Sequence, residues 1–191
     1  MKRFTLFSVI SALFLTLSFA QAAEYMVDKA HSHVEFKVKH MMISNVTGEF
    51  KDFSAVIDFD DKTKKLTKLE GTVIVDSIDT GIDKRDNHLR SDDFFAAAKH
   101  PKMTFVMTAV SDDSVTGNLT IRGVTKKVTF DLDFGGVATD PWGNERMGFE
   151  LSGKLNRKDY GLMWNKTLET GGVLVGDTVK MTIAIEAIKK K

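Results

Sequence analysis

Apolar and polar residues alternate along most of the chain, and this period of two limits the possible folds more than any other feature. Val34, Phe36 and Val38, for example, share one face of such a stretch, while mainly charged residues occupy the other face. Alternation of this kind is typical of β-strands that have one buried face. The chain is therefore predicted to be an all-β protein.

The same alternation marks further strands, which are separated by turn residues. Strands are expected at 34–40, 46–50, 53–59, 69–75, 103–107, 115–121, 128–134, 147–155 and 179–185. About eight antiparallel strands leave two exposed edges unless the sheet closes on itself. Closure gives an eight-stranded antiparallel barrel, whose interior is packed with side chains or holds one small ligand. A two-sheet sandwich is the structural alternative.

The stretch from Ile78 to Pro101 breaks the alternation and is predicted to be a loop followed by a short helix. Ser91 suits the start of this helix, because its side chain can accept a hydrogen bond from a free amide of the first turn. Phe94, Ala97 and Ala98 lie three and four residues apart, so the helix should bury them on one face against the barrel.

Charged residues of both signs crowd the run before this helix, from Asp83 to Arg90. A solvated loop or internal ion pairs are the simplest interpretation, and a polar gate at the mouth of a cavity is the alternative. His40 is in phase with the buried face of its strand and should point inward. A buried imidazole needs a hydrogen-bond partner, which is either a protein group or the polar head of a ligand.

The first 22 residues have the pattern of a secretory signal peptide. Basic residues precede an apolar run from Leu6 to Ala20, and Ala20-Gln21-Ala22 provides the small residues of a cleavage site. We expect cleavage after Ala22 and a soluble, exported domain that spans residues 23–191. The apolar run is short for a membrane span, so no stable membrane anchor is expected.

Charge and motif content argue against several functions. The chain has 27 basic and 26 acidic residues, which disfavours nucleic acid or an anionic membrane surface as the main partner. It has no cysteine, so the core must hold the fold without disulfides. His31-Ser32-His33 offers too few ligands for zinc, and Gly171 to Gly176 lacks the lysine of a phosphate-binding loop. We therefore predict no catalytic residues, no metal and no cofactor.

The filling of the barrel decides the function. Inward-facing positions are rich in Phe and Met, and the flexible Met side chain suits a cavity that adapts to a long apolar ligand. Gly71, Gly117 and Gly153 interrupt apolar faces, where they either leave space or mark bends. The other interpretation is that Phe and Met simply pack the core.

Six runs of the chain carry a family resemblance. They are H-S-H-V-E-F-K-V-K-H-M from His31, R-D-N-H-L-R-S-D-D-F-F from Arg85, G-N-L-T-I-R-G-V-T-K from Gly117, D-P-W-G-N-E-R-M-G-F from Asp140, R-K-D-Y-G-L-M-W-N from Arg157 and G-G-V-L-V-G-D from Gly171. In this order and spacing they resemble the YceI family of exported bacterial proteins. The resemblance implies an extended lipocalin-like barrel with a short helix packed beside it and a long apolar tunnel. It also implies a periplasmic location, an amphiphilic lipid ligand such as a polyisoprenoid, and a homodimer.

The resemblance further implies the ligand-binding residues. The polar groups around the cavity would be His40, Asp86, His88, Arg90, Trp164 and Asn165. The aliphatic wall would be Phe36, Val38, Met103, Phe105, Phe130, Leu132, Phe149, Leu151 and Leu162. In another interpretation, Trp142 and Trp164 plug the barrel ends, which is an ordinary use of aromatic residues at a rim.

Three hypotheses for the function follow. The leading one is a periplasmic binding or carrier protein for a polyisoprenoid, an isoprenoid quinone or a fatty-acid-like lipid, without catalysis. The second is an enzyme that acts on an isoprenoid or quinone head group through His40, Asp86 and Arg90. The third is a stress-protective structural module with a filled barrel. Burial of about fifteen carbons at ~0.8 kcal/mol each offers on the order of 12 kcal/mol before the costs of binding.

Overall fold

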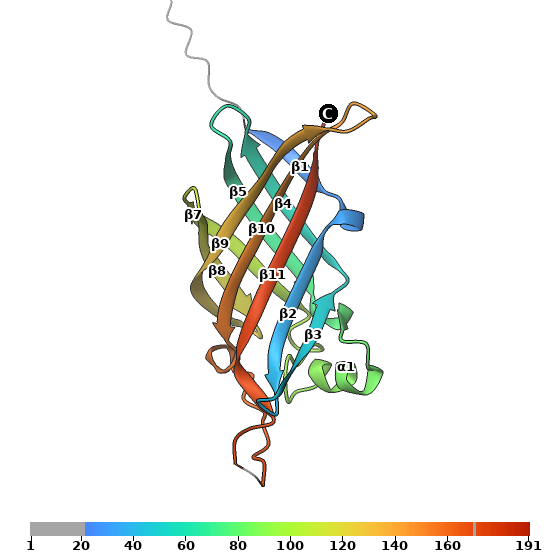
Figure 1. Ribbon diagram of the computed structural model, residues 1–191, viewed down its shortest axis with the longest axis vertical. Coiled ribbons are helices and arrows are strands. Elements are labelled where there is room, and N and C mark those ends of the chain that lie inside the picture. Colours follow the sequence, from blue (N-terminus) through green and yellow to red (C-terminus); the bar gives the residue numbers. More distant parts are fainter. Residues whose placement is uncertain (1–21, 170) are drawn as a thin grey trace, which may run out of the picture.

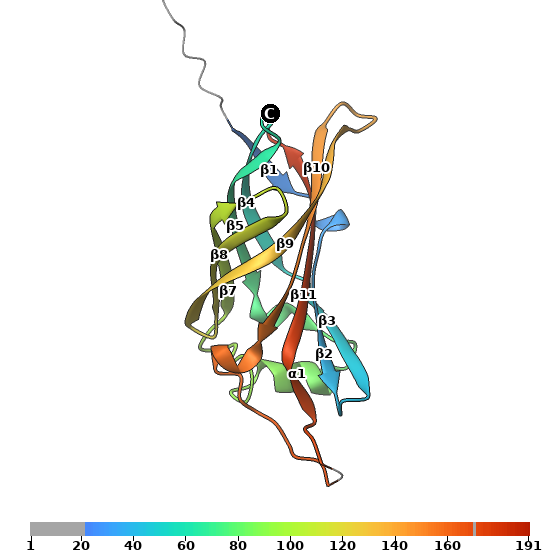
Figure 2. The same ribbon diagram turned by 60° about the vertical axis from the view of Figure 1, so that its left-hand side comes forward.

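The computed structural model describes residues 22–169 and 171–191, so the predicted signal peptide lies outside the described residues except for Ala22. In the described part of the chain, eleven strands form one antiparallel sheet (Figures 1 and 2). The strands are β1 (Ala23–Val27), β2 (His33–His40), β3 (Ser44–Phe50), β4 (Phe53–Asp60), β5 (Lys65–Ile74), β6 (Ile78–Asp79), β7 (Lys102–Val110), β8 (Ser114–Ile121), β9 (Val124–Thr139), β10 (Glu145–Asn156) and β11 (Val175–Lys189). The helices are α1 (Asp83–Arg90) and three short 3-10 turns, η1 (Lys29–His31), η2 (Val75–Ser77) and η3 (Arg157–Tyr160).

Eight of these strands close into a barrel in the order β1-β4-β5-β7-β8-β9-β10-β11. The ring closes where β1 pairs with the end of β11, with Tyr25 opposite Lys189 and Val27 opposite Ala187. The predicted eight-stranded antiparallel barrel with a short helix is therefore confirmed. The strands β1 and β6 were not predicted, and β1 closes the ring by pairing with both β4 and β11.

The strands β2, β3 and β6 extend the sheet beyond the ring. β11 pairs with β1 at its C-terminal end and with β2 over the preceding part of its length. β1 and β2 are therefore consecutive pieces of one strand position, interrupted by η1. At the interruption, Ser32 is buried, and its hydroxyl accepts a hydrogen bond from the amide of Glu186 at 3.0 Å. β2 and β3 lie toward the end of the barrel that carries α1, which is the lower end in Figures 1 and 2.

The predicted helix is wrong in its position. The charged run Asp83–Arg90 forms α1, and the stretch 91–100 forms turns instead of a helix. Ser91 ends α1 instead of starting a helix. Of the residues predicted on a buried helical face, Phe94 and Ala97 are buried and Ala98 is exposed.

Hydrogen bonds that the sequence pattern does not reveal explain this shift. Asp86 is buried in the middle of α1 and accepts a hydrogen bond from the amide of Thr80 at 3.0 Å, which fixes the helix against the preceding loop. The hydroxyl of Ser91 donates to the carbonyl oxygen of His88 at 2.7 Å. Ala96 has a φ of 50°, a left-handed conformation that a continuing helix excludes.

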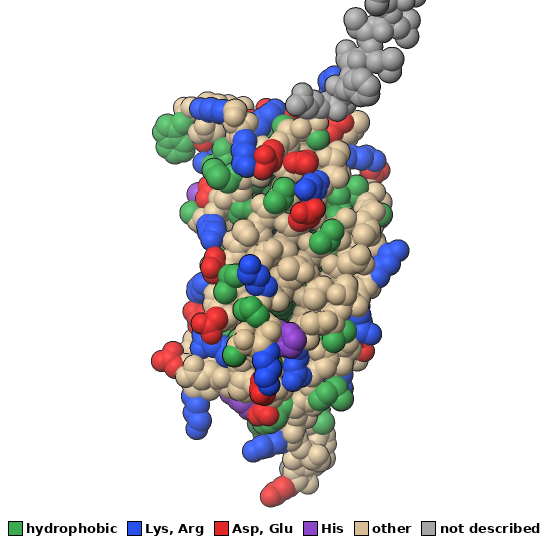
Figure 3. Space-filling model, turned by 180° about the vertical axis from the view of Figure 1, so that it is seen from behind, with side chains coloured by type: hydrophobic (Ala, Val, Ile, Leu, Met, Phe, Trp, Pro, Cys, Tyr) green, Lys and Arg blue, Asp and Glu red, His purple; other side chains and the backbone are tan. Residues whose placement is uncertain are grey.

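The alternation separates a charged exterior from an apolar interior. On the face shown in Figure 3, acidic and basic side chains are interspersed over the barrel wall. Aromatic side chains pack the end opposite α1, which we call the Tyr25 end: Tyr25 and Phe59 are buried, and the Phe59 ring stacks on Phe134 at 5.3 Å. In the described part of the chain, no helix is both long and apolar enough to cross a membrane.

Arg146 of β10 ties several segments together beside η1. Its guanidinium donates to Asp28 at 2.7 Å, to Glu186 at 2.6 Å and to Asp140 at 2.9 Å. The hydrogen bond from Arg146, supported by one from His31, lowers the pKa of Asp28 to about 2. Because ionised Asp28 is favoured in the folded state, it stabilises the fold above about pH 4.

We expect this contribution to disappear as the pH falls from about 4 to 2. The free energy of unfolding should drop by about 1 kcal/mol over that window because of Asp28, in addition to the drop from other carboxylates. Urea unfolding at a series of pH values measures the slope, and Arg146→Met should flatten it. An equal slope in the wild type and in Arg146→Met would contradict this role of the ion pair.

Candidate binding cavity

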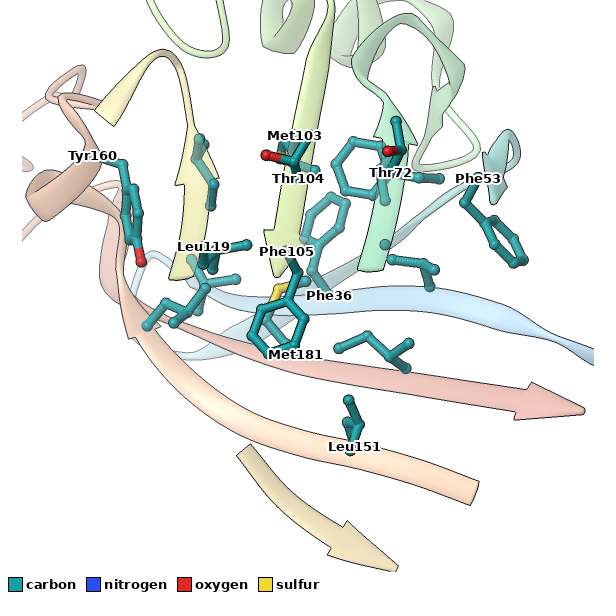
Figure 4. Close-up of a pocket in the computed structure, with 18 of the residues that line it drawn as sticks. Phe36, Phe53, Thr72, Met103, Thr104, Phe105, Leu119, Leu151, Tyr160 and Met181 are labelled. Carbon is teal, nitrogen blue, oxygen red and sulfur yellow. The ribbon is translucent and has the colours of Figure 1, made fainter. Parts of the chain in front are cut away.

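The barrel contains an apolar cavity of about 190 Å³ between the Tyr25 end and α1. Its wall is almost entirely hydrocarbon and comes from opposite sides of the barrel. Phe36 on β2, Phe105 on β7 and Met181 on β11 meet across it in Figure 4. An apolar cavity of about 150 Å³ in another protein stays dry and admits benzene, so a space of this kind suits an apolar guest.

The cavity is elongated along the strands. On β10 and β11 its lining runs from the pair Phe149 and Ile185 to the pair Leu155 and Val179. These pairs are six residues apart on β10, which corresponds to about 20 Å at ~3.3 Å per residue. The space therefore has the shape of a channel and favours a chain-like molecule.

Three segments close the lower end of the cavity: α1, the turns that follow it and the segment that follows η3. We call them together the cover. Leu89 of α1, Phe94 and Leu162 line the cavity there. Trp164 lies in the same cover, with its ring 4.8 Å from the His88 ring and 5.2 Å from the Phe94 ring. This placement agrees with the interpretation of Trp164 as a plug.

Trp142 does not plug the barrel. It lies at the tip of the turn between β9 and β10, and 79% of its surface is exposed. Residues 140–143 form this turn, since the amide of Gly143 donates to the carbonyl oxygen of Asp140 at 3.0 Å. The turn carries its second and third residues away from the barrel, so Trp142 cannot reach the interior.

The predicted wall residues lie mostly on the cavity. Eight of the nine line it, namely Phe36, Val38, Met103, Phe105, Phe130, Phe149, Leu151 and Leu162. Leu132 is the exception: it lies opposite Leu151 in the ladder between β9 and β10 and packs against the core beside the cavity. The residues on the inward face of the alternating pattern therefore form the cavity wall, as expected. Their contact with a ligand stays a prediction.

The predicted polar residues are His40, Asp86, His88, Arg90, Trp164 and Asn165, and in the described part of the chain none of them lines the cavity. Several instead hold the cover in place. Arg90 donates to the carbonyl oxygens of Asp76 at 2.8 Å and Ile78 at 2.9 Å, which joins α1 to the segment before it. Asp86 holds Thr80, as described above.

Asn165 fastens the segment after η3 to the start of β11. Its side-chain amide donates to the carbonyl oxygen of Val175 at 2.7 Å, and its oxygen accepts from the amide of Val175 at 3.0 Å. His88 lies 2.8 Å from the carboxylate of Asp93, and His40 is half-buried at the end of β2. Asn165 and His88 help to build the cover, and contact of His40, His88 or Asn165 with a ligand stays a prediction.

Sequence reasoning missed the polar residues that do line the cavity, which are Ser54, Thr72 and Thr104 of the barrel strands and Arg157 and Tyr160 of η3. Arg157 is only 5% exposed, and its guanidinium donates to the carbonyl oxygens of Gly176 at 2.9 Å, Leu162 at 2.5 Å and Trp164 at 2.9 Å. Burial lowers the pKa of Arg157. The signal was present in the run from Arg157 to Asn165, which contributes to the family resemblance.

Of the two predicted roles of the glycines, open space and bends, open space does not hold for Gly117 and Gly153. A Cβ atom on Gly117 would lie 2.4 Å from the Phe105 ring, and one on Gly153 would lie 2.7 Å from the Phe130 ring. These rings lie over the glycine backbone, and both line the cavity. Only Gly71 of the three has open space, with the nearest atom, Cβ of Phe105, at 4.0 Å.

Alanine at Gly153 should therefore be more costly than alanine at Gly71. Gly153→Ala forces the Phe130 ring to move, and we expect a loss of about 1–3 kcal/mol in the free energy of unfolding. Gly71→Ala is the matched control and should be neutral or slightly stabilising. Urea unfolding of both variants measures the difference, and equal effects would contradict this packing of Phe130 over Gly153.

A possible metal cluster is already compensated by a protein cation. In the described part of the chain, Asp28, His31 and Glu186 place their donor atoms within 4.8 Å of one another. The guanidinium of Arg146 donates to both carboxylates of this cluster. The arrangement is therefore an ion-pair network.

The closed antiparallel barrel and its elongated apolar cavity define the class of this protein. It is a β-barrel whose interior is suited to one small apolar molecule. Within this class, the model of the YceI-like domain matches residues 25–187. The chain therefore belongs to the YceI-like domain family.

Named relatives extend the match over almost their whole length. A UPF0312 protein of Staphylococcus epidermidis is 43% identical over 164 residues, which is 85% of this chain and 96% of the relative. A UPF0312 protein of Staphylococcus aureus is 42% identical over 163 residues, or 85% of this chain and 95% of the relative.

Solved structures share the fold. The crystal structure of a Campylobacter jejuni YceI protein is 39% identical, with a TM-score of 0.69 and full coverage of both chains. BcnA of Burkholderia cenocepacia is 27% identical with a TM-score of 0.69 and covers 84% of this chain and 98% of its own. A polyisoprenoid binding domain from Saccharophagus degradans has a TM-score of 0.66 at 17% identity, over 89% of this chain and 100% of its own, which supports the fold alone.

Proposed function

We propose that the protein binds one long-chain apolar amphiphile inside its barrel and carries or stores it in the periplasm without catalysis. The ligand class comprises polyisoprenoids, isoprenoid quinones and fatty-acid-like lipids. The single observation that carries the proposal is the elongated apolar cavity of about 190 Å³, because a filled structural barrel has no use for such a space.

The flexibility of the wall supports the proposal. A cavity of this volume holds part of a long chain, so a longer ligand requires side chains to move aside. Met103 and Met181 line the cavity, and unbranched thioether side chains repack at low cost. We therefore expect the cavity to expand around its ligand and to discriminate poorly between neighbouring chain lengths.

The fold of the domain from Saccharophagus degradans is a second support, since that protein is described as a polyisoprenoid binding domain. The absence of a catalytic role is supported by Asp86 and Arg90, whose hydrogen bonds to the amide of Thr80 and the carbonyl oxygen of Asp76 join α1 to the segment before it. An enzyme that used them on a head group would first have to dismantle these hydrogen bonds.

Fluorescence of Trp164 tests the proposal in solution. The Trp142→Phe variant leaves Trp164, beside the lower end of the cavity, as the single tryptophan. We expect prenyl quinones and fatty acids to quench or shift its emission in a saturable manner at one ligand per chain. A signal that never saturates, or none with either class of lipid, would contradict binding in the barrel.

The location and the homodimer are separate parts of the proposal. Fractionation of cells that produce the full chain should place a processed protein, beginning near Ala23, in the periplasm. Analytical ultracentrifugation of that protein should give the mass of a dimer. A cytoplasmic, unprocessed protein or a monomer at micromolar concentration would refute the corresponding part and leave ligand binding to be judged by the fluorescence titration.

A further inference from the structure

One buried polar atom in the described part of the chain has no hydrogen-bond partner, and it is the hydroxyl oxygen of Tyr160. Tyr160 is only 2% exposed. Most buried side-chain polar atoms in folded proteins are paired, and an unpaired hydroxyl is costly to bury. Phenylalanine would fill the same space without this cost, so the hydroxyl calls for an explanation.

The hydroxyl lies on the cavity. Tyr160 lines it together with Leu119 and Leu162, and Figure 4 shows the side chain pointing into the pocket from the wall. The backbone around it is fixed, because Arg157 holds the carbonyl oxygen of Leu162 and Gly161 ends η3 with a φ of 76°. The ring is therefore held at the edge of the apolar space and cannot turn to water.

The chemistry of this site favours a neutral oxygen over a charged group. Burial raises the pKa of Tyr160, so the phenol stays protonated and able to donate a hydrogen bond. The charged residue of η3 that lines the cavity, Arg157, already donates to several carbonyl oxygens. A charged head group would find no free counter-charge from it, and burying a charge unpaired is far more costly than burying a carbonyl.

We propose that the hydroxyl of Tyr160 donates a hydrogen bond to a carbonyl oxygen of the ligand, such as that of a ketone, ester, amide or quinone. The polar end of the ligand then lies inside the barrel beside η3, and its apolar chain extends toward Phe149 and Ile185. This inference rests on the proposed function and adds the polar group that the ligand carries and the direction in which it lies.

Two probes that differ only by a carbonyl group test the inference. The dissociation constants of 2-undecanone and undecane are measured for the wild type and for Tyr160→Phe, by competition against an environment-sensitive fluorescent probe bound in the cavity. We expect Tyr160→Phe to weaken 2-undecanone binding about fivefold to tenfold, the usual value of one uncharged hydrogen bond. Undecane binding should be unchanged.

The control is Tyr25→Phe, which removes a hydroxyl from a buried tyrosine that does not line the cavity. It should leave the relative affinity of the two probes as in the wild type. Equal binding of 2-undecanone by the wild type and by Tyr160→Phe would overturn the inference and leave the proposed function standing. Failure of the wild type to bind either probe would instead overturn the proposed function.

An infrared measurement on the wild type keeps the inference testable if Tyr160→Phe does not fold. The carbonyl stretch of bound, ¹³C-labelled 2-undecanone should lie below its frequency in an alkane solvent, because a hydrogen bond weakens the carbonyl bond. A stretch at the alkane frequency would mean that the ketone finds no donor in the cavity, and the inference would be wrong.

Discussion

Methionine at Arg157 should cost about 3–5 kcal/mol of the free energy of unfolding, the largest loss that we expect from a single change in this barrel. Arg157 is buried and supplies hydrogen bonds to the carbonyl oxygens of Gly176, Leu162 and Trp164. Methionine fills much of the same volume and leaves these oxygens without donors. The segment between η3 and β11 should therefore loosen, and the cover should open at that side.

Urea unfolding measures this loss, and Lys158→Met is the matched control. Lys158 is the next residue and forms an ion pair with Asp177 at 2.9 Å, but its side chain is 38% exposed. An exposed ion pair contributes at most about 1 kcal/mol, so Lys158→Met should change little. Similar losses in the two variants would show that the buried hydrogen bonds of Arg157 do not hold the cover.

Phenylalanine at Gly71 should strongly weaken ligand binding while the barrel stays folded. Gly71 lines the cavity and has open space where a side chain would begin, so a benzyl group would extend into the volume that the ligand needs. Displacement of about four methylenes of ligand at ~0.8 kcal/mol each predicts a loss of roughly 100-fold or more in affinity. The fluorescence titration of Trp164 measures this affinity.

Glu70→Phe provides the control for Gly71→Phe. Glu70 is exposed on β5, and its side chain leaves the opposite face of the strand because successive residues alternate. The same aromatic group one residue away should therefore leave affinity unchanged. If Gly71→Phe bound the lipid as tightly as Glu70→Phe, the cavity would not be the binding site.

The strands were predictable because each has one buried face and the alternation reports it directly. The exceptions are β1, which has five residues and begins beside the predicted cleavage site, and β6, which has two, so no long periodic pattern marks either. The helix was misplaced because its stability depends on Asp86 and Thr80. A buried carboxylate in a charged run looks like any solvated charge until its partner is known.

The wall of the cavity was predictable for the same reason as the strands. Residues on the apolar face of each strand, such as Phe36 and Leu151, point into the barrel. The roles of the polar residues were not, because they depend on contacts between segments. Arg90 reaches backbone oxygens twelve and fourteen residues away, and Arg157 reaches one nineteen residues away. Pattern and resemblance named conspicuous polar residues outside the cavity, whereas the buried hydroxyl that has no partner belongs to Tyr160.

Native mass spectrometry of the protein isolated from the periplasm without detergent tests the central claim most directly. The account predicts a stoichiometric adduct, released by organic solvent and identified by its mass as one class of long-chain lipid. A wild-type protein that carries no adduct, and still carries none after incubation with prenyl and acyl lipids, would contradict a lipid-binding barrel.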